Sequence, residues 1–372
     1  MTERFYISDE VTADSVNPIF CCTLVMTMKN KILIFAVSVF FTVFFTSCLL
    51  LAGEFFLRWY YRDVLSVAAG PSYFAEKANH LFMKEINPYG LRGRPISPQH
   101  DGRYRIIVQG DSFTYGQGLY PIGDRYTELL ENSLGKDEFA HGVVILNAGI
   151  CGLNLKEHIG YTKFVKKMHP DFVLYQWFLN DMKENYQIKM GRGVIHNADI
   201  HKYLMRHSAL YNLVQLRYTQ IRSVSGKEES FDADMIKRFR DPASEYSHHA
   251  DKLLDEFFAS YVSEGIDFGV VLFPSFFHDM SDYQLGFIHD RVLARCKQHG
   301  VKCLDLRETF KNTPHTDLWV NPFDAHPGKL ANQMAAEAIY DFYGNYWKEQ
   351  ARSRQGDAGK QMRVDTRLEV TQ

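Results

Sequence analysis

Short runs of apolar residues recur along the chain, and most end at a glycine, an amide or a proline before a stretch with helical spacing begins. Such runs are typical of buried parallel strands. Helices with one apolar face are expected between them, so we predict a parallel sheet with helices on both faces. The predicted strands lie at residues 104–109, 143–146, 172–178, 268–273 and 301–305.

The same pattern divides the chain into segments. We expect an N-terminal tail over 1–31, a transmembrane helix over 32–53, a juxtamembrane connector over 54–100, one α/β domain over 101–348 and a disordered tail over 349–372. Within the domain, residues 183–246 are more polar and are predicted to form an insertion or lid. The last helix of the domain is expected to bury the face that carries Leu330, Met334, Ala338 and Phe342.

The strongest compositional signal is the run at residues 32–53, which contains no charged side chain. About 20 apolar residues suffice for a helix to cross a bilayer, and the aromatic residues that follow the run are typical of a membrane interface. Lys29 and Lys31 favour a cytoplasmic N-terminus, although Arg58 and Arg62 nearly balance them. We therefore expect a single-pass membrane protein whose domain lies outside the cytoplasm.

Two alternatives for this segment stay open. Residues 45–48 form a loose lipoprotein cleavage pattern, so cleavage or lipid attachment near Cys48 is a second interpretation. Met28 also precedes a short basic leader, so residues 1–27 are either an extended gene-model start or a cytoplasmic tail.

Composition narrows the function classes. The chain has 372 residues, of which 46% are hydrophobic and 23% charged, with a formal net charge of −2. This balance lacks the basic footprint of a nucleic-acid-binding protein. The six cysteines include no C-x-x-C pair and predict no zinc site, although Cys296 and Cys303 could pair in an oxidising compartment. We predict neither a metal nor a cofactor.

Candidate chemistry lies where predicted strands end. Gly110-Asp111-Ser112 follows the first strand, and Ser112 is the candidate nucleophile. His326, on a loop before the last helix, is the candidate general base, and Asp324 is near enough to orient it. The backbone N–H groups of Ser112 and Gly149 and the amide of Asn180 are candidate donors to an oxyanion.

Four short blocks in this order resemble the SGNH or GDSL hydrolases, over roughly residues 104–342. The blocks are Gly110-Asp111-Ser112, the glycine of Asn147-Ala148-Gly149, Asn180-Asp181, and Asp324-Ala325-His326-Pro327. The chain departs from the family pattern at Phe178, where glycine is usual, and at Phe323, where many members carry the acid. The resemblance implies a flavodoxin-like three-layer α/β/α sandwich with a mostly five-stranded sheet.

The resemblance also implies a membrane-anchored serine esterase that acts on an acyl ester, whether a small molecule, a lipid or an acylated glycan. One alternative is an O-acetyltransferase or deacetylase of a cell-envelope polysaccharide, and another is a catalytically inactive binding module with the same fold. We expect the substrate pocket to be lined by four aromatic residues, Phe113, Tyr115, Trp177 and Phe178, together with the insertion.

Overall fold

The computed structural model describes residues 28–65, 72–95, 97, 99–136, 142–182, 194–224 and 230–369. The chain divides after Phe56 into two units, which are described separately below. Residues 1–27, for which an extended start or a cytoplasmic tail is expected, lie outside the described residues.

The first unit consists of most of helix α1 (Met28–Tyr60). By length and composition, residues Asn30–Tyr60 could cross a membrane: their most apolar 18-residue window has a mean hydropathy of 2.5, and none of this window is buried. A signal sequence near an N-terminus has the same properties, so the length and apolarity of α1 do not by themselves distinguish an anchor from a leader.

The second unit is built on a five-stranded sheet with the order β2-β1-β3-β4-β5, in which all neighbouring strands are parallel. Its strands are β1 (Tyr104–Gly110), β2 (Val143–Gly149), β3 (Phe172–Trp177), β4 (Asp267–Leu272) and β5 (Lys302–Asp305). This is the flavodoxin-like order, in which ligands bind beyond the carboxyl ends of the strands near β1 and β3. The predicted fold is therefore confirmed, with each strand within a few residues of its expected range.

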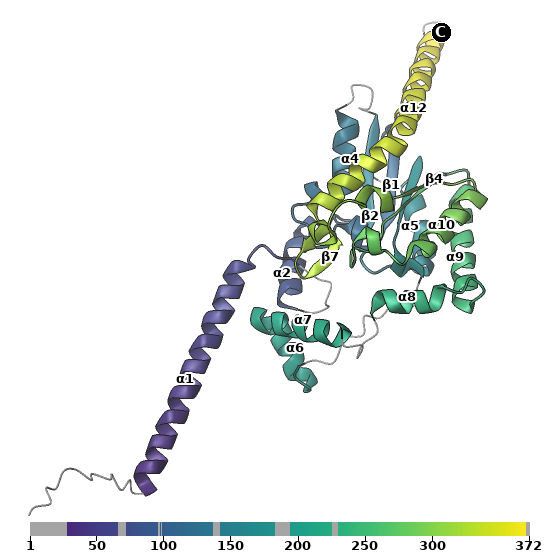
Figure 1. The fold of residues 1–372 in the computed structure, drawn as a ribbon. Helices are drawn as coiled ribbons and strands as arrows, with labels where there is room; N and C mark the ends of the chain where they lie inside the picture. Colours follow the sequence, from purple (N-terminus) through teal and green to yellow (C-terminus); the bar gives the residue numbers. More distant parts are fainter. Residues whose placement is uncertain are drawn as a thin grey trace, which may run out of the picture. The chain divides into compact units, whose positions relative to one another are not determined.

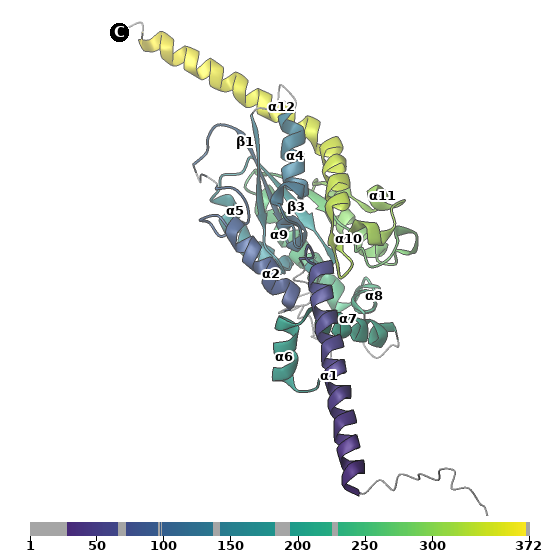
Figure 2. The same ribbon diagram turned by 90° about the vertical axis from the view of Figure 1, so that its left-hand side faces the viewer.

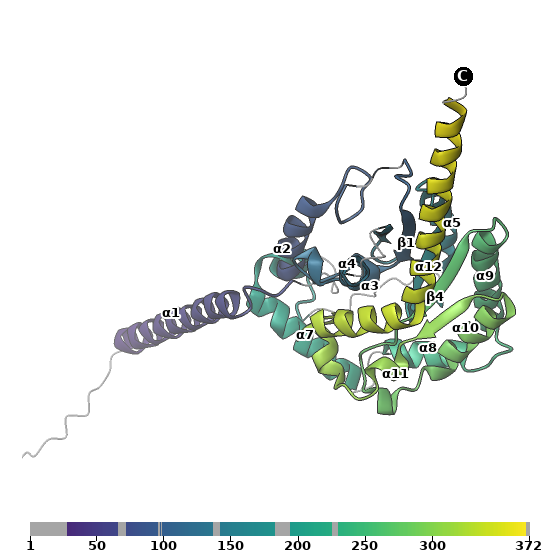
Figure 3. The same cartoon turned by 90° about the horizontal axis from the view of Figure 1, so that it is seen from above.

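Helices cover both faces of the sheet, and alternate strand residues feed two separate cores. Ile107 belongs to a core beneath α5, α9 and α10, whereas Ile106 and Val108 belong to a core beneath α4 and α12. Figure 1 shows α4 and α12 side by side, and Figure 3 shows α9 and α10 on the other side of the sheet from α4. These helices are α4 (Tyr126–Gly135), α5 (Leu155–Lys166), α9 (Glu245–Val262), α10 (Gly286–Gln298) and α12 (Lys329–Glu369).

Shorter elements connect and extend this framework. The α-helices are α2 (Tyr73–Phe82), α3 (Ser112–Tyr115), α6 (Ala198–His207), α7 (Ala209–Val224), α8 (Phe231–Phe239) and α11 (Arg307–Phe310). A two-stranded antiparallel ribbon joins β6 (Trp319–Asn321) to β7 (Asp324–Pro327). The 3-10 turns are η1 (Met83–Glu85), η2 (Ile122–Asp124), η3 (Leu179–Met182), η4 (Met280–Asp282) and η5 (His315–Leu318).

Part of the predicted insertion, residues 183–193 and 225–229, lies outside the described residues. Its described part is largely helical, and Ser208 separates α6 from α7. In β5 and α10, Cys303 and Cys296 form the disulfide that the sequence allows, with their Cα atoms 6.3 Å apart.

The predicted buried face of α12 is wrong by about one residue. Leu330 and Phe342 are exposed, at 41% and 46%, whereas Ile339 and Tyr343 are fully buried. A one-residue shift rotates the apolar stripe by about 100°, and small alanines rather than large apolar residues meet α4 along the first turns. The face in contact with the domain consists of Ala331, Ala335, Ala336, Ile339, Tyr343, Trp347 and Ala351.

The helix also differs from the sequence analysis at its C-terminal end. It continues to Glu369, whereas a disordered tail is expected from residue 349. Figure 2 shows α12 running beyond α4. Ala351 still belongs to the buried face, so packing accounts for the helix a few residues past position 348 and not for its further course to Glu369.

The corrected face can be tested by two alanine substitutions in α12. Ile339→Ala removes fully buried methylene groups and should lower the free energy of unfolding by about 2–5 kcal/mol. Leu330→Ala, on the exposed side, should cost less than about 1 kcal/mol. Urea denaturation followed by tryptophan fluorescence measures both, and equal losses would contradict the assigned face.

Candidate active site

Ser112 lies at the turn where β1 ends and the short helix α3 begins. Asp111 is the N-cap residue of α3, and its Oδ1 accepts a hydrogen bond from the N–H of Phe113 at 2.9 Å. As the first residue of α3, Ser112 has a backbone N–H with no carbonyl acceptor inside the helix. Ser112 is 7% exposed, so its hydroxyl is held within the protein surface rather than on a free loop.

One buried side chain on the neighbouring strand holds this turn. The Oε1 atom of Gln176 in β3 accepts from the N–H of Asp111 at 3.1 Å, and from the N–H and Oγ1 of Thr114 at 3.3 and 2.9 Å. Space is tight at Gly110, where an added Cβ would lie 2.1 Å from Thr114 Oγ1 and 2.5 Å from Gln176 Oε1. The glycine of the first block is therefore required by close packing.

His326 and Asp324 lie on β7, two residues apart. Side chains at positions i and i+2 of a strand project to the same face, so the acid reaches the histidine directly. His326 Nδ1 donates to Asp324 Oδ1 at 2.5 Å, and the His326 N–H reaches the same oxygen at 3.1 Å. Because the carboxylate only accepts, the neutral ring carries its proton on Nδ1 and leaves Nε2 as an acceptor. Ser112 Oγ lies 2.9 Å from this Nε2 atom.

The electrostatic environment of His326 favours its charged form. Burial lowers the pKa of the imidazole, but the charge and hydrogen bond of Asp324 and the charge of Asp111 outweigh it, so the pKa lies above its usual value. The Asp324 side chain is fully buried, and the His326 side chain is 19% exposed. A positive charge that forms on His326 is therefore stabilised from within the protein.

Asp111 has a second, unusual property. Its Oδ2 atom is buried and has no hydrogen-bond partner among the described residues. Burial and the charge of Asp181 raise the pKa of Asp111 to about 6, against the opposing effects of the Phe113 N–H, His158 and His326. The cap residue of α3 thus belongs to a group of buried acids directly behind Ser112.

Asn180 lies on η3, the turn that follows β3. Its Oδ1 atom is buried and has no hydrogen-bond partner among the described residues. The turn is closed by Asp181, whose Oδ2 accepts from the N–H of Phe178 at 2.9 Å and whose own N–H donates to the Phe178 carbonyl at 3.0 Å. Phe178 therefore occupies the usual glycine position of the third block while both its backbone groups bond to Asp181.

Gly149 is placed differently from its expected role as an oxyanion donor. Its N–H donates to the side-chain oxygen of Asn147 at 3.0 Å, while the Asn147 amide nitrogen donates to the Thr114 carbonyl and to Thr127. A Cβ at Gly149 would lie 2.3 Å from the backbone nitrogen of Tyr115. Gly149 therefore lets β2 approach α3, and its N–H is engaged within its own turn.

The four aromatic residues expected at a substrate pocket separate into two groups. Phe113 lies 5.4 Å from the His326 ring and 4.3 Å from the Phe178 ring, between ring centroids, so this pair borders the site. Trp177 is fully buried and packs against His289 in the core, because the strand's alternation directs it away from the site. Tyr115 packs against Phe82 of α2.

Two buried arginines that sequence reasoning missed, Arg92 in the connector and Arg125 before α4, hold the backbone at and just after the end of α3. Arg92 donates to the carbonyls of Gly116 at 2.7 Å and Leu119 at 2.6 Å, and Arg125 donates to the carbonyl of Arg92 at 2.9 Å. The connector is therefore part of the folded unit. Its only sequence signal is the turn-rich stretch at residues 87–93.

The loop between β6 and β7 also rests on residues that directly follow the apolar helix. The Phe323 ring lies 4.7 Å from Tyr61 and 5.9 Å from Phe74, between ring centroids. Asn321 Nδ2 donates to the Leu65 carbonyl at 3.1 Å. Phe323, the residue directly before Asp324, therefore makes aromatic contacts and supplies no acid to His326.

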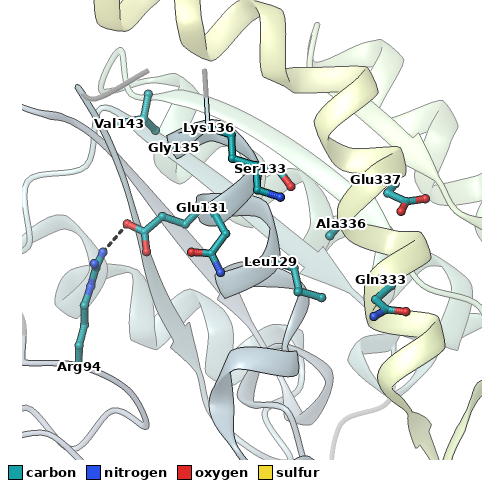
Figure 4. Close-up of a pocket in the computed structure, with 11 residues that line it drawn as sticks. Arg94, Leu129, Glu131, Ser133, Gly135, Lys136, Val143, Gln333, Ala336 and Glu337 are labelled. Carbon is teal, nitrogen blue, oxygen red and sulfur yellow. Dashed lines mark hydrogen bonds and ion pairs between the residues drawn. The ribbon is translucent and has the colours of Figure 1, made fainter. Parts of the chain in front are cut away.

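A separate groove of about 830 Å³ lies between α4 and α12 (Figure 4). Val143, the first residue of β2, lines it, so it opens at the opposite end of the strands from Ser112. Its most prominent interaction is the ion pair between Arg94 and Glu131 at 2.5 Å. The groove holds no nucleophile–base pair among its lining residues, and it is distinct from the candidate site.

Fold and site together define an α/β sandwich in which a serine, a histidine and an aspartate lie in hydrogen-bonded sequence at the carboxyl end of the sheet. No protein-family model and no curated protein matches the chain. In solved structures, the chain is similar to LAE5, an α/β hydrolase from the metagenome of Lake Arreo, Spain, with 17% identity and a TM-score of 0.42 over 65% of this chain and 95% of that one.

Two acetylxylan esterases are similar at the same level. A catalytic mutant of Axe2 from Geobacillus stearothermophilus has 14% identity and a TM-score of 0.41, over 65% of this chain and 94% of that one. The acetyl xylan esterase AlAXEase has 16% identity and a TM-score of 0.40, over 64% and 98%. These likenesses are too distant to assign an activity, so the function is argued from the site itself.

Proposed function

We propose that the chain is an SGNH-type serine hydrolase of acyl esters. The observation that carries the proposal is the continuous contact from Ser112 Oγ to His326 Nε2, at 2.9 Å, and from His326 Nδ1 to Asp324 Oδ1, at 2.5 Å. A hydroxyl nucleophile needs a base within hydrogen-bond reach and an acid that orients the base. Both distances and their donor directions meet this requirement without rearrangement.

The reaction follows from these contacts. Ser112 Oγ attacks the ester carbonyl while its proton passes to His326 Nε2, and the imidazolium is stabilised by Asp324 and Asp111. His326 then gives the proton to the departing alcohol, which leaves an acyl group on Ser112. A water molecule, deprotonated by His326, attacks this acyl group and releases the carboxylic acid and free Ser112.

The tetrahedral intermediate requires donors to its oxyanion. We assign this role to the Ser112 N–H and the Asn180 amide, which come from the ends of the adjacent strands β1 and β3. The Gly149 N–H joins them only if it leaves the Asn147 side chain. Phe113 and Phe178 would border the acyl group, since both lie next to the catalytic pair.

We further propose that α1 anchors this hydrolase in a membrane, with the domain outside the cytoplasm. The length and apolarity of α1 support the anchor. The disulfide between Cys296 and Cys303 supports an oxidising compartment, because such bonds are rare where thiols are kept reduced.

Kinetic measurements can distinguish the proposed roles of Ser112, the nucleophile, and Asn180, the donor to the oxyanion. Ser112→Ala should abolish p-nitrophenyl acetate hydrolysis and labelling by a fluorophosphonate, because no other side chain supplies the attacking oxygen. Asn180→Ala should lower kcat by about 10²- to 10³-fold, the usual cost of one oxyanion donor, while fluorophosphonate labelling still maps to Ser112. Wild-type turnover by Ser112→Ala would refute the mechanism.

Asp324 should determine how kcat/KM depends on pH. Only neutral His326 accepts the Ser112 proton, so kcat/KM should rise with pH through a midpoint above 6.5, the ordinary histidine value. In Asp324→Asn the opposing effect of burial gains weight, so the rising limb should move to lower pH and the maximal rate should fall. A pH profile of kcat/KM measures both changes, and an unmoved limb would contradict the role of Asp324.

The membrane anchor has its own test. The full chain expressed in a bacterial host should stay with the membrane fraction after alkaline carbonate extraction, which strips peripheral proteins. In intact spheroplasts, an external protease should reach the domain, whereas a cytoplasmic marker enzyme stays protected. Release by carbonate, or a domain that is protected until the spheroplasts are lysed, would contradict the proposed anchoring or orientation respectively.

A further inference from the structure

A buried histidine outside the four blocks lies behind the candidate site. His158, on α5, is fully buried, and its Nε2 atom is 3.4 Å from Oδ1 of the equally buried Asp181; neither atom has a hydrogen-bond partner among the described residues, so each is the other's facing polar group. The ring packs edge-on against Tyr175 at 5.2 Å, between centroids. Histidine on an otherwise apolar helix face is often only a packing residue, so the direction of its hydrogen bonds decides what it does.

The neighbouring Gln109, in β1, fixes that direction. Its Nε2 donates to the His158 backbone carbonyl at 3.1 Å, and a carbonyl only accepts, so the orientation of the amide is determined. The same Nε2 lies 3.3 Å from His158 Nδ1, which therefore acts as an acceptor. The hydroxyl of Tyr261 donates to the other end of the Gln109 amide. The neutral His158 ring thus carries its proton on Nε2, facing Asp181.

Asp181 in turn holds the turn that presents Asn180. One carboxylate oxygen accepts from the Phe178 N–H, and the other faces His158. The pKa of Asp111, which caps the helix of Ser112, is raised by burial and by the negative charge of Asp181. His158 therefore lies where the Ser112 turn and the Asn180 turn meet, and its Nε2 atom faces the carboxylate between them across 3.4 Å, next to Tyr175, which also interacts with Asp181.

We propose that His158 is a positioning residue that, through Nε2–H and Asp181, holds Asn180 at the oxyanion position beside Ser112. The catalytic consequence rests on the proposed function, whereas the structural consequence, a fixed turn at residues 178–182, does not. His158 touches no reacting atom. Its loss should therefore act on the rate of the chemical step and leave substrate affinity nearly unchanged.

Replacing His158 by glutamine or by asparagine tests the roles of its two ring nitrogens separately. In His158→Gln the side-chain nitrogen reaches approximately the place of Nε2, so the donor to Asp181 is kept. In His158→Asn the shorter amide reaches only the place of Nδ1, so Gln109 keeps its partner and Asp181 loses the N–H group that faces it. Both variants remove the ring and keep an amide, so they differ in whether an N–H group reaches Asp181.

Hydrogen exchange of the full-length protein in detergent gives a readout that needs no activity. In His158→Asn, the amides of the peptide at residues 178–182 should exchange at least about tenfold faster than in the wild type, because Asp181 no longer holds the Phe178 N–H firmly. His158→Gln should stay near the wild-type rate. With p-nitrophenyl acetate as substrate, kcat should fall at least about tenfold in His158→Asn but little in His158→Gln. KM should be unchanged in both variants.

Equal behaviour of the two variants, in exchange and in kcat, would overturn the proposal. If either variant fails to fold, Asp181→Asn serves instead, because its new N–H₂ group would face the Nε2–H of His158 and should loosen the same peptide; unchanged exchange there would overturn it too. An inactive wild type whose exchange still separates Asn from Gln would refute the proposed function alone. Wild-type activity with no separation would refute only the role of His158.

Discussion

The candidate site depends on the hydrogen bonds that the amide oxygen of Gln176 accepts. It lies within a buried strand and accepts donors from Asp111 and Thr114, on either side of Ser112. An unpaired amide in this position would cost about 1–3 kcal/mol in desolvation, so the strand residue and the turn stabilise each other. The nucleophile is therefore registered to the sheet by a side-chain bond in addition to its backbone connection.

Buried acidic side chains lie next to the turn that carries Ser112. Asp324 and Asp111 both raise the pKa of His326, and burial together with the charge of Asp181 raises the pKa of Asp111 to about 6. A charge on Asp111 is therefore unfavourable in the resting protein. The arrangement becomes favourable when His326 takes up a proton, so part of the stabilisation of a charged intermediate is built into the folded chain.

The sheet was predictable because it depends on local features. Each strand is a continuous apolar run, and both faces of a parallel sheet are buried, so the pattern is hard to miss. Ser112, Asn180 and His326 were singled out because each was expected beside a strand end or a helix start; the structure places His326 within β7 and not on a loop. Gln176 and Arg92 were missed because their role depends on partners distant in sequence. The face of α12 was misjudged because four of its buried residues are alanines, which carry little hydrophobic signal.

The position of Gly149 shows another limit. A glycine after a strand suggests an available N–H, but Asn147, two residues earlier, takes that N–H through an Asx-type bond. The spacing of Asp324 and His326 is the opposite case, in which an unusual sequence pattern still gives the expected contact. It departs from the common pattern, yet a two-residue interval on a strand places both side chains on one face, so the contact follows directly from strand geometry.

The aromatic contact of Phe323 with Tyr61 and Phe74 has a practical meaning for work with soluble forms of the protein. The sequence places the start of the domain near residue 101, but the loop before Asp324 is supported by residues that precede this boundary by about 40 positions. A fragment trimmed to the α/β sandwich would keep Ser112 and lose the residues that pack against the loop before Asp324. The smallest unit that keeps these contacts therefore begins where the apolar helix ends.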